Sequence, residues 1–198
     1  MRNIGHIRNF LDAFVTWSSA QVDVQAIALV GSYARGAARA DSDIDLVILT
    51  HGHIDHVGGL PLFTHCPILL TKAERAEPRP IYWGNVRPIA WPDTTYHQIT
   101  ADTEICNSLT ALPTPAHTPA HLSLILTLPD GQTIILAADA INRASEPSEG
   151  YPDATDRATA AISGRRLLHL QTRHNATLIY GHDPAQWPVL AKAPQVYV

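Results

Sequence analysis

Cysteine is scarce in this chain: Cys66 and Cys106 are the only two among 198 residues. They form neither a Cys-x-x-Cys pair nor a disulfide framework, so we interpret both as small buried hydrophobic side chains and expect a cytosolic protein. Lysine and arginine form no cluster and the formal net charge is -4, which argues against a nucleic-acid partner. No apolar run is long enough to span a membrane, and residues 1–6 lack a signal-peptide hydrophobic region.

The composition is that of a globular protein, with 45% apolar and 16% charged residues. A chain of this length can bury one substantial core or two small ones. Eleven histidines are many for this length, and their spacing carries most of the functional signal.

The most informative stretch is His51–His56, which reads His-Gly-His-Ile-Asp-His directly after the apolar run at 44–49. This order predicts a loop at the C-terminal end of a strand, where sheet proteins commonly carry their chemistry. Imidazole and carboxylate donors together suit zinc, and iron, manganese or cobalt can take the same ligands. A histidine-rich polar turn is the alternative, but burying so many polar groups without partners is costly.

Three further motifs follow in order. Residues 114–121 read Thr-Pro-Ala-His-Thr-Pro-Ala-His, residues 137–140 read Ala-Ala-Asp-Ala, and residues 180–183 read Tyr-Gly-His-Asp. With the first cluster, they resemble the metal-binding signatures of the metallo-β-lactamase superfamily, over roughly residues 43–198. Two glycines of the family's third-histidine motif are replaced here by Ala116 and Ala120.

The resemblance implies a dinuclear zinc hydrolase with an αββα sandwich fold. The first metal would be held by His51, His53 and His117, the second by Asp55, His56 and His182, with Asp139 bridging them. Two such ions activate a shared water near neutral pH and polarise the carbonyl that it attacks. Asp55 would also orient that water or receive its proton, and His121 is expected to support the site rather than bind metal.

The substrate class follows from the same resemblance. Residues 181–187 resemble the C-terminal motif of the N-acyl homoserine lactonase-like branch, whereas the motif at 114–121 is shared with the glyoxalase II branch. A small ester or lactone is therefore the expected substrate. Lactonases often carry a tyrosine three residues after the bridging aspartate, where this chain has Asn142; its amide could donate a hydrogen bond to the substrate.

The first fifty residues resemble a different family. A helical stripe at 4–17 and a strand at 24–30 lead into Gly31 and Ser32, followed by Asp43 and Asp45. This pattern resembles the polymerase-β-like nucleotidyltransferases, in which such groups bind nucleotide phosphates and Mg²⁺. The third carboxylate of that family has only a poor candidate in Glu104, so a Mg²⁺-dependent nucleotidyltransferase and an inactive hybrid are the alternatives to a hydrolase.

We therefore expect a fusion: a nucleotidyltransferase-like fragment at 1–50 and a hydrolase domain at 43–198, with the strand at 43–50 shared. The fold class is α/β, an αββα sandwich whose N-terminal half is truncated and replaced by a helix and a strand. One sheet would then be short, rebuilt, or completed by a second chain in a homo-oligomer, because an open apolar edge invites pairing.

The remaining pattern predicts the elements of the hydrolase domain. They are a helix at 55–63, a strand at 67–70, a helical turn at 72–77, a long loop at 78–93, strands at 96–100 and 103–112, a hairpin at 121–126 and 133–137, a helix at 153–174 and a strand at 177–180.

Overall fold

The computed structural model of the chain describes residues 46–64, 66–80 and 86–191. The helix predicted at 4–17, the strand predicted at 24–30 and the alternative nucleotide site (Gly31, Ser32, Asp43 and Asp45) lie outside the described residues. The division into domains at 1–50 and 43–198 therefore stays a prediction. Within the described ranges, no helix is both long and apolar enough to cross a membrane.

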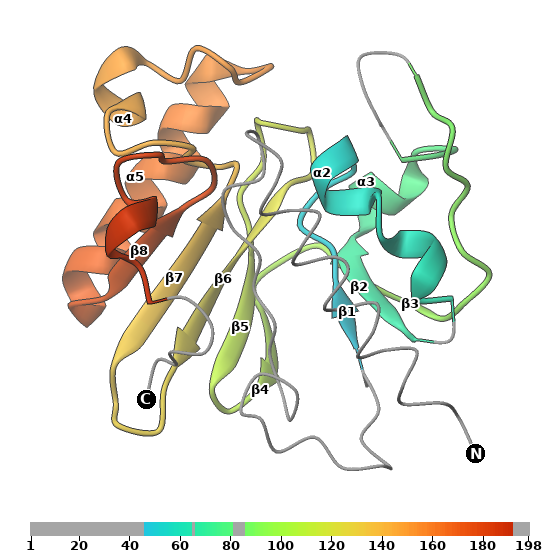
Figure 1. Ribbon diagram of the computed structural model, residues 1–198, viewed down its shortest axis with the longest axis horizontal. Helices are drawn as coiled ribbons and strands as arrows, with labels where there is room; N and C mark the ends of the chain where they lie inside the picture. The colour runs from blue at the N-terminus through green and yellow to red at the C-terminus, as the bar shows by residue number, and fades with distance from the viewer. Residues whose placement is uncertain (1–45, 65, 81–85, 192–198) are drawn as a thin grey trace.

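A small parallel sheet forms the first β layer. Its strands, in spatial order, are β1 (Val47–Ile48), β2 (Ile68–Thr71) and β3 (Tyr96–Ile99). Two short helices, α2 (Ile54–Val57) and α3 (Lys72–Ala76), lie beside this sheet on the side away from the rest of the molecule (Figure 1).

The central strand β2 is buried along its whole length, as expected of a parallel strand that is covered on both faces. Alternate side chains of a strand point to opposite faces. Ile68 and Leu70 accordingly pack with Val57 of α2 in one cluster. Leu69 packs with Leu122 of the second sheet in another. β2 thus joins the outer helices to the interface between the sheets.

The second layer is a five-stranded sheet. Its strands, in order, are β4 (Thr103–Cys106), β5 (Leu109–Pro113), β6 (Leu122–Thr127), β7 (Thr133–Ala138) and β8 (Thr177–Tyr180). Neighbours are antiparallel except for β7 and β8, which are parallel. A parallel pair needs a crossover connection, and α4 (Glu146–Glu149) and α5 (Arg157–His174) provide it.

Helix α5 covers the outer face of the second sheet (Figure 1). Leu167 of α5 is fully buried and belongs to the same cluster as Ile135 of β7 and Leu178 of β8. The layers therefore run helices, sheet, sheet, helix. This is the expected αββα sandwich.

Several elements match their predictions closely. The hairpin appears as β6 and β7, and the last strand is β8. Helix α5 begins at Arg157 rather than at 153, because the Asp156 carboxylate accepts hydrogen bonds from the backbone N–H groups of Ala158 and Thr159. Such a capping side chain satisfies donors that have no partner within the helix, and so defines its start.

Three predictions were wrong. The run at 103–112 is two strands, β4 and β5, which turn at residues 107–108. The helix at 55–63 is divided into α2 and a 3₁₀ helix with a proline in its first turn (Leu60–Leu62). Cys66 is buried as expected, but Cys106 is exposed, because side chains alternate along β4 and Cys106 points to the face opposite the one on which Ile105 packs. Glu104 is also exposed on β4.

Candidate metal centre

The predicted ligands come from four loops that meet at one end of the sandwich. One loop follows β1, and the others follow β5, β7 and β8. Since β5, β7 and β8 run in the same direction, their C-terminal ends share one edge of the sheet. The Leu122 N–H donates to the Thr50 carbonyl at 2.9 Å, which joins the first loop to that edge.

The seven predicted ligands lie together in two groups. Within each group, one nitrogen or oxygen from every residue lies within 4.8 Å of the others. The first group is His51, His53, His117 and Asp139, and the second is Asp55, His56, Asp139 and His182. Asp139 belongs to both groups, and the bridging role that the resemblance implies for it stays a prediction.

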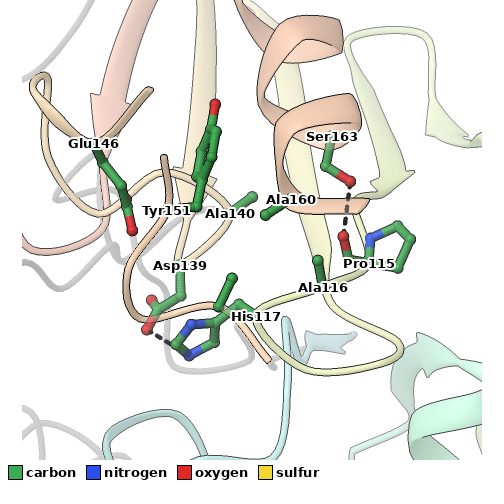
Figure 2. A pocket seen from close by; sticks show the side chains of 10 residues that line it. Pro115, Ala116, His117, Asp139, Ala140, Glu146, Tyr151, Ala160 and Ser163 are labelled. Atoms are coloured by element: carbon green, nitrogen blue, oxygen red, sulfur yellow. Dashed lines mark hydrogen bonds and ion pairs between the residues drawn. The ribbon is translucent and has the colours of Figure 1, made fainter. Parts of the chain in front are cut away.

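Asp139 directs its two carboxylate oxygens at different histidines. Its Oδ1 lies 3.3 Å from His56 Nε2. Its Oδ2 lies 3.2 Å from His117 Nε2 and 3.3 Å from His182 Nε2 (the His117 contact is drawn in Figure 2). His51 Nε2 is 3.8 Å from the same Oδ2. A single carboxylate therefore reaches donors of both groups.

Unpartnered buried atoms provide a test of whether a cation fits. Among the described residues, four buried side-chain atoms make no hydrogen bond: His51 Nε2, His56 Nε2, Asp139 Oδ1 and Asn142 Oδ1, although His56 Nε2 and Asp139 Oδ1 form an ion-pair contact of 3.3 Å. Buried polar atoms are nearly always paired, and three of these four belong to the ligand groups. Imidazole nitrogens and a carboxylate oxygen gathered in this way are a donor set that suits zinc.

The histidines of the first group are held neutral. Burial lowers the pKa of His51 well below its ordinary value, and the nearby His56 lowers it further. Burial also lowers the pKa of His53 and His117, whose facing ring nitrogens lie 2.9 Å apart. Neutral imidazole is the form that binds a metal ion.

In the second group the pKa values of the histidines are raised instead of lowered. Burial disfavours a charged His56, but the carboxylates of Asp139 and Asp55, each 3.3 Å from its Nε2, outweigh burial and raise its pKa to about 9. The same two carboxylates raise the pKa of His182 to about 10. Burial alone would raise the pKa of Asp55 and Asp139. Their contacts with these histidines outweigh burial and hold both pKa values below the usual range. Without metal, His56 and His182 therefore carry protons.

His121 supports the centre in the way the sequence suggests. It is fully buried, and its Nε2 accepts the Asp139 backbone N–H at 3.1 Å. The proton therefore lies on Nδ1, which donates to Thr114 Oγ1 at 2.9 Å. The Thr114 hydroxyl donates to Ser123 Oγ, and the Ser123 hydroxyl donates to the Ala137 carbonyl. Burial lowers the pKa of His121 to about 3, so the ring is neutral and oriented.

The turn at 181–183 is closed by backbone contacts. Gly181 is required there, because an added Cβ would lie 2.6 Å from the Ala138 carbonyl oxygen. The His182 N–H donates to the Asn142 carbonyl at 2.9 Å. The Asp183 carboxylate accepts from three backbone N–H groups, those of Ala144, Ala185 and Gln186. These bonds fix the direction of His182.

Asn142 and Ala116 differ from the family pattern. Asn142 is 5% exposed, so its side chain has little open access to the centre; its predicted role in substrate binding stays a prediction. Ala116, beside His117, has φ of 129°, a value that glycine adopts far more readily. Ala116, His117, Asp139 and Tyr151 line one pocket, and the Tyr151 hydroxyl points away from Asp139 toward α5 (Figure 2).

Sequence reasoning missed three buried carboxylates near the centre, Glu74, Glu146 and Asp183. Each accepts a backbone N–H bond: Glu74 from Gly52, Glu146 from Asn142, and Asp183 from Ala144. Asp183 belongs to a motif noted in the sequence, so the signal was available there. Glu74 lies in a short helix with no motif, and only the folded chain shows its role.

Comparison with known proteins agrees with this geometry. The family model described as "Metallo-beta-lactamase superfamily" matches residues 21–182. The N-acyl homoserine lactonase AttM of Rhizobium radiobacter is 26% identical over 175 residues, covering 79% of this chain and 64% of that protein. The N-acyl homoserine lactonase AiiA of Bacillus thuringiensis subsp. kurstaki is 30% identical over 147 residues, covering 73% and 58%.

Solved structures give the same result. A structure of N-acyl homoserine lactone hydrolase with N-hexanoyl-L-homoserine bound at its metal centre superposes with a TM-score of 0.68 at 26% identity, covering 77% of this chain and 61% of that one. AidC, a dizinc quorum-quenching lactonase, shares the fold with a TM-score of 0.57 at 19% identity, covering 86% and 69%.

The match also bears on the predicted fusion. This chain spans 64% of the length of AttM. The family match begins at residue 21, inside the segment interpreted as a nucleotidyltransferase fragment, and these comparisons give that fragment no support. Since the match covers most of the chain and includes all seven clustered ligands, the chain belongs to the metallo-β-lactamase superfamily.

Proposed function

We propose that this chain binds two zinc ions and hydrolyses small lactones, with N-acyl homoserine lactones as the substrate class. The observation that carries the proposal is the pair of ligand groups that share Asp139. The similarity to N-acyl homoserine lactonases supports the choice of substrate. Iron, manganese or cobalt could take the same ligands, but nitrogen-rich donor sets of this kind favour zinc.

His51, His53 and His117 would hold one ion, and Asp55, His56 and His182 the other, with Asp139 between them. When bound, the two ions would lower the pKa of water and polarise the substrate carbonyl. The chain itself fixes the donors: His121 holds the Asp139 backbone, and the bond from the His182 N–H to Asn142 fixes the last ligand.

Asp55 is the carboxylate best placed to move a proton. Its side chain is 32% exposed, whereas that of Asp139 is 6% exposed. Its Oδ2 lies 3.2 Å from His182 Nε2, so Oδ1 is the oxygen that would receive a proton from the attacking water. Hydrolysis breaks the bond between the carbonyl carbon and the ring oxygen. Asp55 would then return the proton to that oxygen, leaving a hydroxy acid.

Asn142 would take part in substrate binding only if its side chain turned toward the centre. The unpartnered Oδ1 makes such a change less costly, because no side-chain acceptor bond to a described residue is lost. Asn142→Ala should then raise KM with little change in kcat, since an amide would contribute to binding rather than to chemistry.

The experiment is a metal count combined with a hydrolysis assay. The purified chain should contain about two zinc ions, and N-hexanoyl homoserine lactone should release acid, measured with a pH indicator. His53→Ala and Asp139→Ala should abolish hydrolysis and lower the zinc content. His169→Ala, an exposed histidine on α5, is the matched control. Full zinc without hydrolysis would reject the substrate class, and unchanged zinc in His53→Ala would reject the site.

A further inference from the structure

Glu74 is a buried carboxylate outside both ligand groups. It lies in α3 and is 3% exposed, with its own backbone N–H donating to Thr71 Oγ1 at the start of the helix. No ion pair to Glu74 occurs among the described residues, and burial raises the pKa of its carboxyl group. Burying a carboxylate without a cationic partner is costly, so its hydrogen bonds should account for its position.

Those hydrogen bonds join two separate histidine loops. Glu74 Oε1 accepts the Gly52 backbone N–H at 2.7 Å, and Gly52 lies between the candidate ligands His51 and His53. Glu74 Oε2 accepts the Thr118 hydroxyl at 3.1 Å, and Thr118 directly follows the candidate ligand His117. One carboxylate thus connects the segments that supply all three histidines of the first group.

A second contact strengthens this connection. The Thr71 hydroxyl donates to the Ala120 carbonyl at 2.6 Å, so the start of α3 contacts the 114–121 loop twice. Of the second group, His182 is fixed by other contacts, namely the backbone bond to Asn142 and the turn at Asp183, while Asp55 and His56 follow Gly52 on its loop. The contacts of α3 thus reach both histidine loops of the first group but leave His182 of the second group untouched, so α3 should act more strongly on the first group.

We propose that Glu74 is a positioning residue that fixes the distance between the two histidine loops, and so sets the zinc affinity of the first group without contacting a metal ion. The inference rests on the proposed two-zinc site. Residues that orient metal ligands in this way commonly change affinity by about 10- to 100-fold when removed.

The test isolates each group and measures zinc affinity directly, by competition with a chelator of known affinity. Asp55→Ala with His182→Ala leaves the first group, and His53→Ala with His117→Ala leaves the second. Adding Glu74→Ala should weaken binding about 10- to 100-fold in the first background and by less than about 3-fold in the second.

Two further variants keep the test decisive if Glu74→Ala folds poorly. Glu74→Gln keeps an acceptor for the Gly52 N–H, and its amide can donate to the Thr118 oxygen, so it should retain most of the affinity. Thr118→Val removes only one of the two bonds and should give an intermediate loss in the first background. Glu77→Ala, an adjacent half-buried glutamate, is the matched control and should change neither affinity.

The measured affinities distinguish failure of the inference about Glu74 from failure of the proposed two-zinc site. An equal loss in both backgrounds would show that Glu74 only stabilises the fold and would overturn the inference. Unchanged affinity in both backgrounds would overturn it as well. If neither background binds zinc even with Glu74 intact, the proposed two-zinc site is itself wrong and the inference falls with it. Thermal unfolding of each metal-free variant distinguishes loss of stability from loss of ligand placement.

Discussion

Zinc binding should displace protons from the second ligand group but not from the first. His56 and His182 have pKa values of about 9 and 10 because two carboxylates contact each of them. Both are therefore protonated at pH 7.5, and a metal ion must displace both protons, so loading this group should release about two protons per chain. His51, His53 and His117 are neutral through burial and should release almost none.

The direction of the pH dependence follows from these raised pKa values. Protons compete with zinc at every pH below about 9, so the affinity of the second group should rise as pH increases. With two protons displaced, each pH unit between 6.5 and 8.5 should change that affinity by about 100-fold. The first group should depend only weakly on pH above 6.5.

Isothermal titration calorimetry at pH 7.5, in two buffers of different ionisation enthalpy, measures the protons released at each equivalent of zinc. The pre-arranged, neutral first group should fill first and release few protons, and the second equivalent should release about two. The chain with His53→Ala and His117→Ala, which keeps the second group, is the control and should still release about two. A second equivalent with no proton release, or an affinity independent of pH, would refute the assignment of charges.

Three smaller perturbations test the support of the centre. Gly181→Ala would place a Cβ 2.6 Å from the Ala138 carbonyl oxygen, so the turn must move. The chain should then bind about one zinc ion instead of the proposed two, as counted by elemental analysis; full zinc would contradict this. Thr114→Val leaves the buried His121 Nδ1–H without its acceptor and should lower the free energy of unfolding by about 1–3 kcal/mol, measured by urea denaturation. Ala116→Gly relieves a φ of 129° and should raise the free energy of unfolding by about 1 kcal/mol, and a loss in the same assay would show that the backbone is not strained there.

The candidate ligands could be named from the sequence because most of their signals are local. His51, His53, Asp55 and His56 lie within six residues, directly after an apolar run. The other three ligands each follow or precede a recognisable strand. Their assignment to two groups came from the resemblance to the metallo-β-lactamase superfamily, and the structure brings the same residues together in two groups.

What the sequence could not predict depends on contacts between distant segments. Glu74 and Thr118 are 44 positions apart, and nothing in a short polar helix indicates that one glutamate is buried and its neighbour Glu77 is not. The exposure of Cys106 depends on which face of β4 packs against the other layer, and that is decided by the assembly of the two sheets. The strand break falls on Asn107 and Ser108, which both favour turns, so a local signal for this break was present in the sequence and was overlooked.

The two ligand groups have similar residues but opposite protonation, and the cause lies in how many carboxylates each contains. In the first group, three buried histidines share one carboxylate, so desolvation prevails and the rings stay neutral. In the second, two histidines meet two carboxylates, so charge attraction prevails and both rings bind protons. The metal-free centre is therefore electrically neutral, since two imidazolium groups balance Asp55 and Asp139.

Binding of the two proposed zinc ions would change that charge balance. They would add four positive charges while about two protons leave, so the centre would gain a net charge of about +2. In a site this buried, positive charge is weakly screened and strongly favours electron-rich oxygen. A carbonyl oxygen that becomes negative as water adds to it is stabilised by such a field, whereas a cationic substrate is repelled. The same charge should favour the carboxylate of the product, so slow product release is the expected cost of a centre that changes from neutral to positive on binding zinc.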